Sequence, residues 1–142
     1  MISDTPSVSQ LSQVISQAIA PAFILGALAA FISVLTLRMN RVVDRSQALN
    51  AIGTDPARAH LKADLPRMKR RALLLNKAIL FASLSAIVAT LLVMLAFVSA
   101  FFGIEHERGI AIFFILTLGF FAASLINFAR ETRIALHEFD YY

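Results

Sequence analysis

The stretch AILFASLSAIVATLLVMLAFVSAFF (residues 78–102) decides the fold class, because it runs for 25 residues without a charged side chain. A helix that crosses the hydrocarbon core of a bilayer needs about 20 apolar residues, at a rise of about 1.5 Å each. Two further charge-free runs, of 19 and 20 residues, occupy residues 19–37 and 110–129. We therefore predict an all-α fold with three transmembrane helices.

The composition indicates a chain that folds in lipid. Of its 142 residues, 58% are hydrophobic and 15% are charged, against about 45–50% and about 25% in soluble globular domains. The chain contains no cysteine, so disulfide bonds and thiolate chemistry are excluded. No basic segment precedes the first apolar run, so we expect this run to be retained as a membrane helix rather than removed as a signal peptide.

The cations are distributed unevenly between the two ends of the predicted spans. Ten of the 13 lysines and arginines fall in residues 38–77 and two more in residues 130–142, whereas the turn at residues 103–109 carries only Arg108. Loops rich in lysine and arginine stay on the cytoplasmic side of a membrane. We therefore expect residues 38–77 and the tail at 130–142 in the cytoplasm, and the N-terminus and the short turn outside.

Residues 6–18 carry no charge and have the apolar spacing of an amphipathic helix, with Val8, Leu11 and Ile15 on one face. This pattern fits a helix that lies on the outer membrane surface. It fits equally well a helix that continues the first span, with a bend at Pro21. Both alternatives stay open at the level of sequence.

Residues 38–77 are predicted to form an antiparallel helical hairpin that extends the first two spans. Seam residues, apolar with one exception, recur at spacings of four and three on both arms, as in a coiled coil. They are Leu35, Met39, Val42, Ser46 and Leu49 on the first arm and Leu65, Met68, Ala72, Leu75 and Ile79 on the second. Gly53 is expected to end the first arm.

The basic residues of the hairpin are the first candidate binding site. Arg38, Arg41 and Arg45 lie three and four residues apart and share one helix face. We expect such cations to fix the membrane topology and to contact anionic lipid headgroups or an acidic partner. The full set is Arg38, Arg41, Arg45, Arg67, Lys69, Arg70, Arg71 and Lys77. Nucleic acid is not an expected partner, because no aromatic residue lies among these cations.

Asp44 is an acidic residue in this basic neighbourhood and is the candidate clamp of the hairpin. Val42 and Ala72 are expected at similar heights on the two arms, which brings Asp44 close to the double arginine. We predict an ion pair between Asp44 and Arg70 or Arg71. An exposed pair contributes only about 0–1 kcal/mol, so the clamp would set the register of the hairpin more than its stability.

Small residues form a stripe along the first span. Ala18, Ala22, Gly26 and Ala30 follow one another at intervals of four residues, a spacing that lets another helix approach closely. The stripe predicts helix packing, either within one chain or between copies. The alternative is an ordinary alanine-rich membrane helix with no special contact.

Patterns typical of enzymes and of cofactor sites are missing from the sequence. It has no HExxH, no GxSxG and no phosphate-binding glycine loop, and no charge lies inside the three apolar runs. We expect no catalytic activity, no cofactor and no metal. The leading hypothesis is a non-enzymatic membrane scaffold or accessory subunit that assembles with itself or joins a larger membrane complex. The alternative is a homo-oligomeric channel, with the serines and threonines of the spans lining a pore.

Two motifs carry a resemblance to a known family. RMNRVVDRSQAL (residues 38–49) and RRALLLNKAILFASLSA (residues 70–86) resemble the DUF2721 family of small bacterial membrane proteins, and the resemblance covers residues 16–133. It implies a three-helix bacterial integral membrane protein and carries over no activity. We expect the protein in the bacterial cytoplasmic (inner) membrane. A site in the family motif would map onto Arg38, Asn40, Arg41, Asp44, Arg45, Arg70, Arg71 and Asn76.

Overall fold

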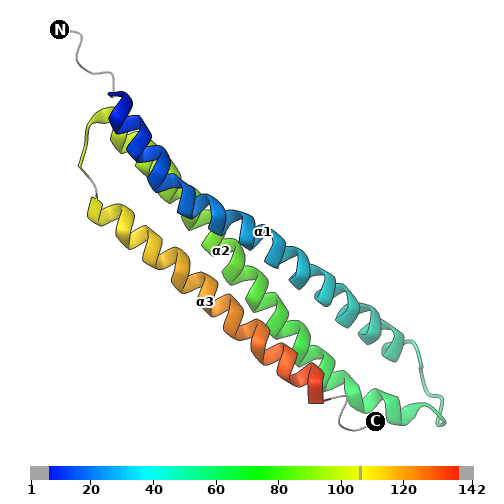
Figure 1. The fold of residues 1–142 in the computed structure, drawn as a ribbon. Helices are drawn as coiled ribbons and strands as arrows, with labels where there is room; N and C mark the ends of the chain where they lie inside the picture. The colour runs from blue at the N-terminus through cyan, green and yellow to red at the C-terminus, as the bar shows by residue number, and fades with distance from the viewer. Residues whose placement is uncertain (1–6, 106, 138–142) are drawn as a thin grey trace. The chain divides into compact units, whose positions relative to one another are not determined.

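The computed structural model describes residues 7–105 and 107–137, and all regular elements in these ranges are helical. Helix α1 runs Val8–Asn50, the 3₁₀ helix η1 Ala59–Asp64, α2 Leu65–Phe102 and α3 Glu107–His137 (Figure 1). The predicted all-α class is confirmed. The chain divides into two compact units, Met1–Ala30 with Ala82–Ala122 and Phe31–Phe81 with Ala123–Tyr142, called unit 1 and unit 2 below. Each long helix contributes to both units.

Helix α1 is a single helix from Val8 onward, so residues 8–18 continue the first apolar run rather than forming a separate helix. Pro21 lies inside this helix and is buried. Its missing N–H removes one helical hydrogen bond. The expected start at Pro6 lies outside the described residues. At the other end of the chain, residues 130–137 of the predicted tail are helical and belong to α3.

Helix α1 ends close to Gly53, the residue at which the sequence predicts the end of the first arm. Gly53 has a φ of +63°, a left-handed conformation that side chains with a Cβ rarely adopt. Two residues later, the Asp55 carboxylate accepts a hydrogen bond from the Ala57 N–H at 3.1 Å, which closes the turn around Pro56. Residues 38–50 and 65–77 thus continue α1 and α2 beyond their charge-free runs.

The buried positions of all three helices follow a seven-residue repeat, which is typical of helices that pack with coiled-coil geometry. On α2 the buried residues alternate at spacings of three and four for most of its length. The buried residues of the three helices are Pro21, Leu28, Leu35, Val42 and Leu49 on α1, Met68, Leu75, Ala78, Ala82, Ser85, Ala89, Leu92, Ala96 and Ser99 on α2, and Thr117, Ser124 and Glu131 on α3. Most of the α2 residues are small, so its neighbours can pack close to its backbone.

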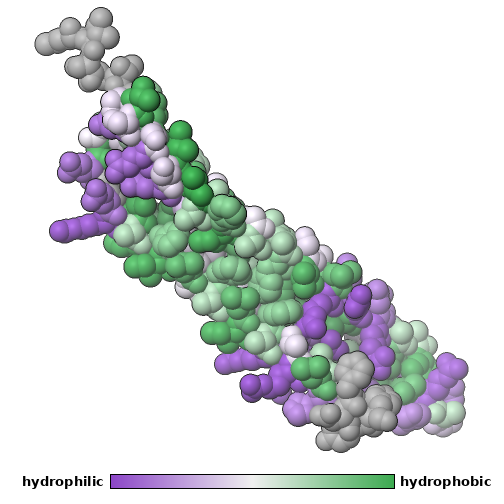
Figure 2. All heavy atoms as spheres, in the orientation of Figure 1, coloured by the Kyte–Doolittle hydropathy of each residue, from purple (hydrophilic) through white to green (hydrophobic). Residues whose placement is uncertain are grey.

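All three long helices are long and apolar enough to cross a membrane, and large apolar side chains such as Phe23 and Ile115 are exposed on them. On the face shown in Figure 2, unit 1 carries hydrophilic residues around the start of α1 and the α2–α3 turn, whereas hydrophobic residues cover its helices further along. Unit 2 carries its hydrophilic residues toward the α1–α2 connection. Apolar surface of this extent needs lipid as its solvent. The chain is a multi-pass membrane protein.

Candidate functional site

Polar side chains occupy the buried positions of α3 at intervals of seven residues. Thr117, Ser124 and Glu131 are each at most 1% exposed. In unit 1, the Ser85 hydroxyl donates a hydrogen bond to the backbone carbonyl of Thr117 at 2.7 Å. In unit 2, the Ser124 hydroxyl donates to the Ala78 carbonyl at 2.6 Å. These hydroxyls bind the backbone of a neighbouring helix, so the positions need small side chains and define the register between α2 and α3.

Glu131 is the one buried charged residue in the described part of the chain. Its Oε2 accepts a hydrogen bond from Nη1 of Arg38 on α1 at 2.5 Å. Its Oε1 lies 2.9 Å from both Nε and Nη2 of Arg71 on α2. One carboxylate on α3 therefore joins the three helices of unit 2. We call Glu131, Arg38 and Arg71 the charge triad.

The surroundings of Arg38 fix its guanidinium group on several sides. Its Nη1 also donates to the Thr132 hydroxyl at 2.7 Å. Its Cζ lies 4.9 Å from the centre of the Phe128 ring, a geometry that attracts a cation to an aromatic face. Phe31 of α1 packs edge-on against Phe128, with 5.3 Å between the ring centres. Arg38 is thus held by an anion, a hydroxyl and a ring, all of them on α3.

The charge triad joins three helices through one carboxylate that pairs with two arginines. A buried carboxylate without partners is costly, and here both oxygens receive charge-assisted hydrogen bonds from arginine. The described residues contain no group of three or more His, Cys, Asp or Glu side chains able to hold a metal ion.

The basic residues predicted as a binding site separate into two groups. Arg38 and Arg71 enter the charge triad. The remaining six, Arg41, Arg45, Arg67, Lys69, Arg70 and Lys77, are exposed or partly exposed and form no common site. Arg67 and Arg70 line a cavity between α2 and α3. Contact of these cations with lipid headgroups or an acidic partner stays a prediction.

The predicted clamp from Asp44 is not formed, and the structure gives Arg71 a different acidic partner. Asp44 is exposed and has no ion pair with Arg70 or Arg71, all of which belong to the described residues. It follows the buried Val42 by two residues, which turns its side chain about 200° around α1 and away from the seam. Glu131 occupies the interior instead and pairs with Arg71.

Sequence reasoning missed Glu131, although a signal for it was present. The third apolar run ends at Ala129, and the residues beyond it were assigned to a tail. However, Thr117, Ser124 and Glu131 are spaced by sevens, the same repeat that defines the seams of α1 and α2. Extending this repeat by one step along α3 would have placed a carboxylate among the basic residues of the hairpin.

The stripe of small residues lies outside the packed interior of the chain. Ala22, Gly26 and Ala30 are exposed, and Ala18 is partly exposed. A Cβ placed on Gly26 would have no neighbouring atom within 4 Å. The face that α1 buries carries Pro21 and Leu28 instead. The stripe is therefore not used within the described chain, and packing between copies stays a prediction.

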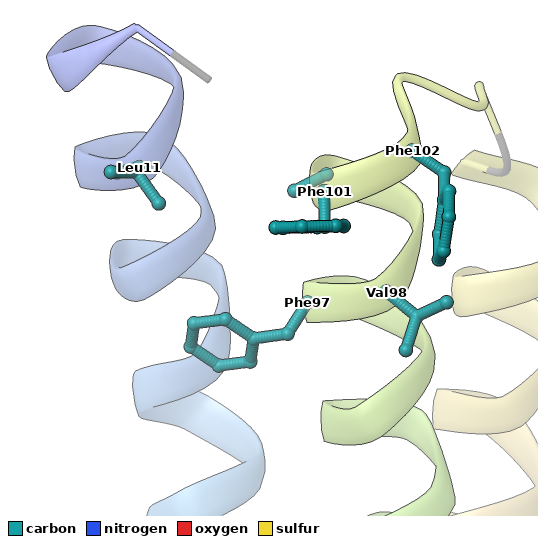
Figure 3. A pocket seen from close by; sticks show the side chains of 6 residues that line it. Leu11, Phe97, Val98, Phe101 and Phe102 are labelled. Atoms are coloured by element: carbon teal, nitrogen blue, oxygen red, sulfur yellow. The ribbon is translucent and has the colours of Figure 1, made fainter. Parts of the chain in front are cut away.

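Unit 1 contains an apolar recess of about 290 Å³ between α1 and α2. Figure 3 shows Phe97 and Phe101 reaching from α2 toward the part of α1 that carries Leu11. Val98, Ala100 and Phe102 complete the lining. Among the described residues, only apolar side chains line this recess.

Comparison with protein families finds one match. A family model described as "Protein of unknown function (DUF2721)" matches residues 18–141, nearly the whole chain. Comparisons with curated proteins and with solved structures give no match. The family match covers α1 from Ala18 onward, all of α2 and α3, and every member of the charge triad.

Proposed function

The chain belongs to the DUF2721 family of proteins of unknown function, and we propose that it is a non-enzymatic membrane scaffold or accessory subunit that assembles through the exposed stripe on α1. The charge triad serves this role by holding the three helices of unit 2 in one arrangement. The stripe itself belongs to unit 1 and is open to a second copy or to a subunit of a larger membrane complex.

One observation carries the proposal: the stripe is largely exposed, and its second half, Gly26 and Ala30, lies on the face of α1 opposite to the one that packs within the chain. Gly26 and Ala30 each lie two residues from the buried Leu28 and hence about 160° from it around the helix axis. Helices associate in lipid through close backbone contact at small residues. A second helix can reach α1 here without disturbing the seam of the chain itself.

The channel hypothesis has less support. Ser85 and Ser124 donate their hydrogen bonds to neighbouring helices of the same chain. Thr90 is exposed, but its hydroxyl donates to the Ala86 carbonyl of its own helix at 2.8 Å. Hydroxyls used in this way supply packing contacts rather than a polar lining for ions.

We expect Ala22→Leu to separate the assembly, because a leucine on the stripe keeps a second helix from approaching closely. Particle mass in lipid nanodiscs measures the effect, and the wild type should contain at least two copies or a bound partner. Ala27→Leu is the matched control, since Ala27 is also exposed on α1 but lies outside the stripe. It should keep the wild-type mass. A monomeric wild type without a partner, or equal masses for both variants, would argue against the proposal.

We further propose that the protein lies in the bacterial cytoplasmic membrane, with the α1–α2 connection and the C-terminus in the cytoplasm. The support is the concentration of cations in residues 38–77. A green fluorescent protein fused to the C-terminus should fluoresce, and alkaline phosphatase at the same position should be inactive. The reverse result for the two fusions would invert the topology.

A further inference from the structure

A cavity of about 440 Å³ lies in unit 2 between the start of α2 and the end of α3. Its lining combines apolar and cationic side chains: Pro66, Arg67 and Arg70 come from α2, and Ile134 and His137 come from α3. Figure 1 shows these ends of α2 and α3 near each other. We call this cavity the basic cleft.

The arginines of the basic cleft are not neutralised by the described part of the chain. Neither Arg67 nor Arg70 forms an ion pair or a hydrogen bond with a described residue. Arg71, the next residue along α2, by contrast forms an ion pair with the buried Glu131. Two guanidinium groups therefore face a cavity in whose lining the described residues include no acid. Such an arrangement is complementary to an anion, because arginine pairs with phosphate through parallel hydrogen bonds.

The basic cleft lies at the outer edge of the lipid headgroup layer. The charge-free run of α3 ends at Ala129, and Ile134 follows five residues later. At about 1.5 Å per residue, Ile134 is about 7–8 Å beyond the edge of the hydrocarbon core. The headgroup layer extends about 5–7 Å from each side of that core. Ile134 thus lies at the outer edge of this layer, and the long side chains of Arg67 and Arg70 can reach from the cleft toward a headgroup phosphate. Pro66 and Ile134 offer apolar surface to the rest of the lipid.

We propose that the basic cleft binds the headgroup of an anionic phospholipid, with Arg67 and Arg70 donating hydrogen bonds to its phosphate. The imidazole of His137 supplies a further N–H donor. The lipid comes from the leaflet on the side of the α1–α2 connection. This site is separate from the charge triad and from the stripe on α1, and it does not depend on assembly between copies.

Native mass spectrometry of the full-length protein in neutral detergent tests the site with phosphatidylglycerol as the probe. In detergent there is no charged bilayer surface, so cations outside the cleft should contribute little. We expect a retained phosphatidylglycerol adduct whose apparent affinity falls by about tenfold or more in the double variant Arg67→Gln with Arg70→Gln. The matched control is Arg41→Gln with Arg45→Gln, which removes the same charge from exposed positions on α1 and should change the affinity by less than about threefold.

Two further probes separate the lipid from its chemical relatives. Phosphatidylcholine, whose headgroup has no net charge, should bind more weakly than phosphatidylglycerol. Inorganic phosphate alone should give no retained adduct, because it lacks the glycerol and acyl portion that contacts Pro66 and Ile134. An equal loss of phosphatidylglycerol affinity in both double variants would show that the lipid is attracted by charge in general, and this result would overturn the proposal. Equal binding of inorganic phosphate would overturn it in favour of a free-anion site.

Circular dichroism and gel filtration establish that each variant is folded. The cleft arginines are exposed or partly exposed, so their replacement should leave the helix content unchanged. If the double variant were not folded, the single variants Arg67→Gln and Arg70→Gln would supply the same comparison. Unchanged phosphatidylglycerol affinity in both single variants would contradict the proposal.

Discussion

Replacing Glu131 with alanine will lower the free energy of unfolding by about 3–5 kcal/mol, because it leaves two cations at an interior site without their anion. Glu131 is fully buried, and its partners Arg38 and Arg71 are 31% and 14% exposed. Neither arginine can recover full hydration without moving away from α3. Unfolding in mixed micelles with increasing dodecyl sulfate, followed by circular dichroism, measures the loss.

Two comparisons make this prediction specific to the charge triad. Asp44→Ala removes an exposed acid of α1 and should change the free energy of unfolding by less than about 0.5 kcal/mol. Replacing all three triad members with leucine or methionine should recover most of the loss, since apolar residues of similar volume can substitute for a buried ion pair. Equal losses in the free energy of unfolding for Glu131→Ala and Asp44→Ala would show that the charge triad does not contribute to stability.

The second large effect is expected at Ser124, where a larger side chain cannot fit between α2 and α3. Ser124 is fully buried, and its hydroxyl lies 2.6 Å from the Ala78 carbonyl. Ser124→Leu should cost about 1–3 kcal/mol, because overpacking a close contact forces the helices apart. Ser124→Ala removes only the hydrogen bond and should cost about 0.6 kcal/mol.

The same unfolding titration tests this prediction with a control on the same helix. Ala122 is exposed on α3, so Ala122→Leu adds comparable bulk where lipid or detergent can accommodate it. We expect its free energy of unfolding to stay within about 0.5 kcal/mol of the wild type. A cost for Ser124→Leu no greater than that for Ala122→Leu would mean that α2 and α3 do not pack closely at this position.

The fold class followed from the sequence because lipid imposes a simple rule on composition. Charge-free runs of about 20 residues have few alternatives to membrane helices, and residues 19–37, 78–102 and 110–129 each lie within one long helix. The break at Gly53 was also predictable, since a left-handed residue there favours glycine. Local chemistry was sufficient for these features.

The charge triad depends on contacts between helices, and these were only partly predictable. Arg38 and Arg71 were already candidate residues, but their anion was sought at Asp44, which is close to Arg38 in the sequence. The actual anion, Glu131, lies on a third helix. Only the register of α3 against α2 brings it to Arg71, and that register depends on small buried residues such as Ser124 and Ala78. Counting the charges in each loop cannot show which acidic residue pairs with Arg71.

The sequence contains two helical repeats, and the structure buries one of them and exposes the other. Residues at a spacing of seven, such as Leu35, Val42 and Leu49, are buried. Residues at a constant spacing of four, such as Ala22 and Gly26, are exposed. A constant spacing of four drifts by about 40° per step around a helix, whereas the seven-residue repeat stays close to one line. The exposed repeat is consequently the one available to a second molecule.

Disulfide crosslinking in the membrane tests assembly through this stripe most directly. The chain has no cysteine of its own, so a single introduced cysteine can react only with a second molecule. We predict that Ala22→Cys, on the stripe, forms a crosslinked dimer in native membranes under mild oxidation and that Ala27→Cys, on the same helix outside the stripe, does not. Absence of the dimer for Ala22→Cys, or equal dimer yields for both variants, would contradict assembly between copies through α1.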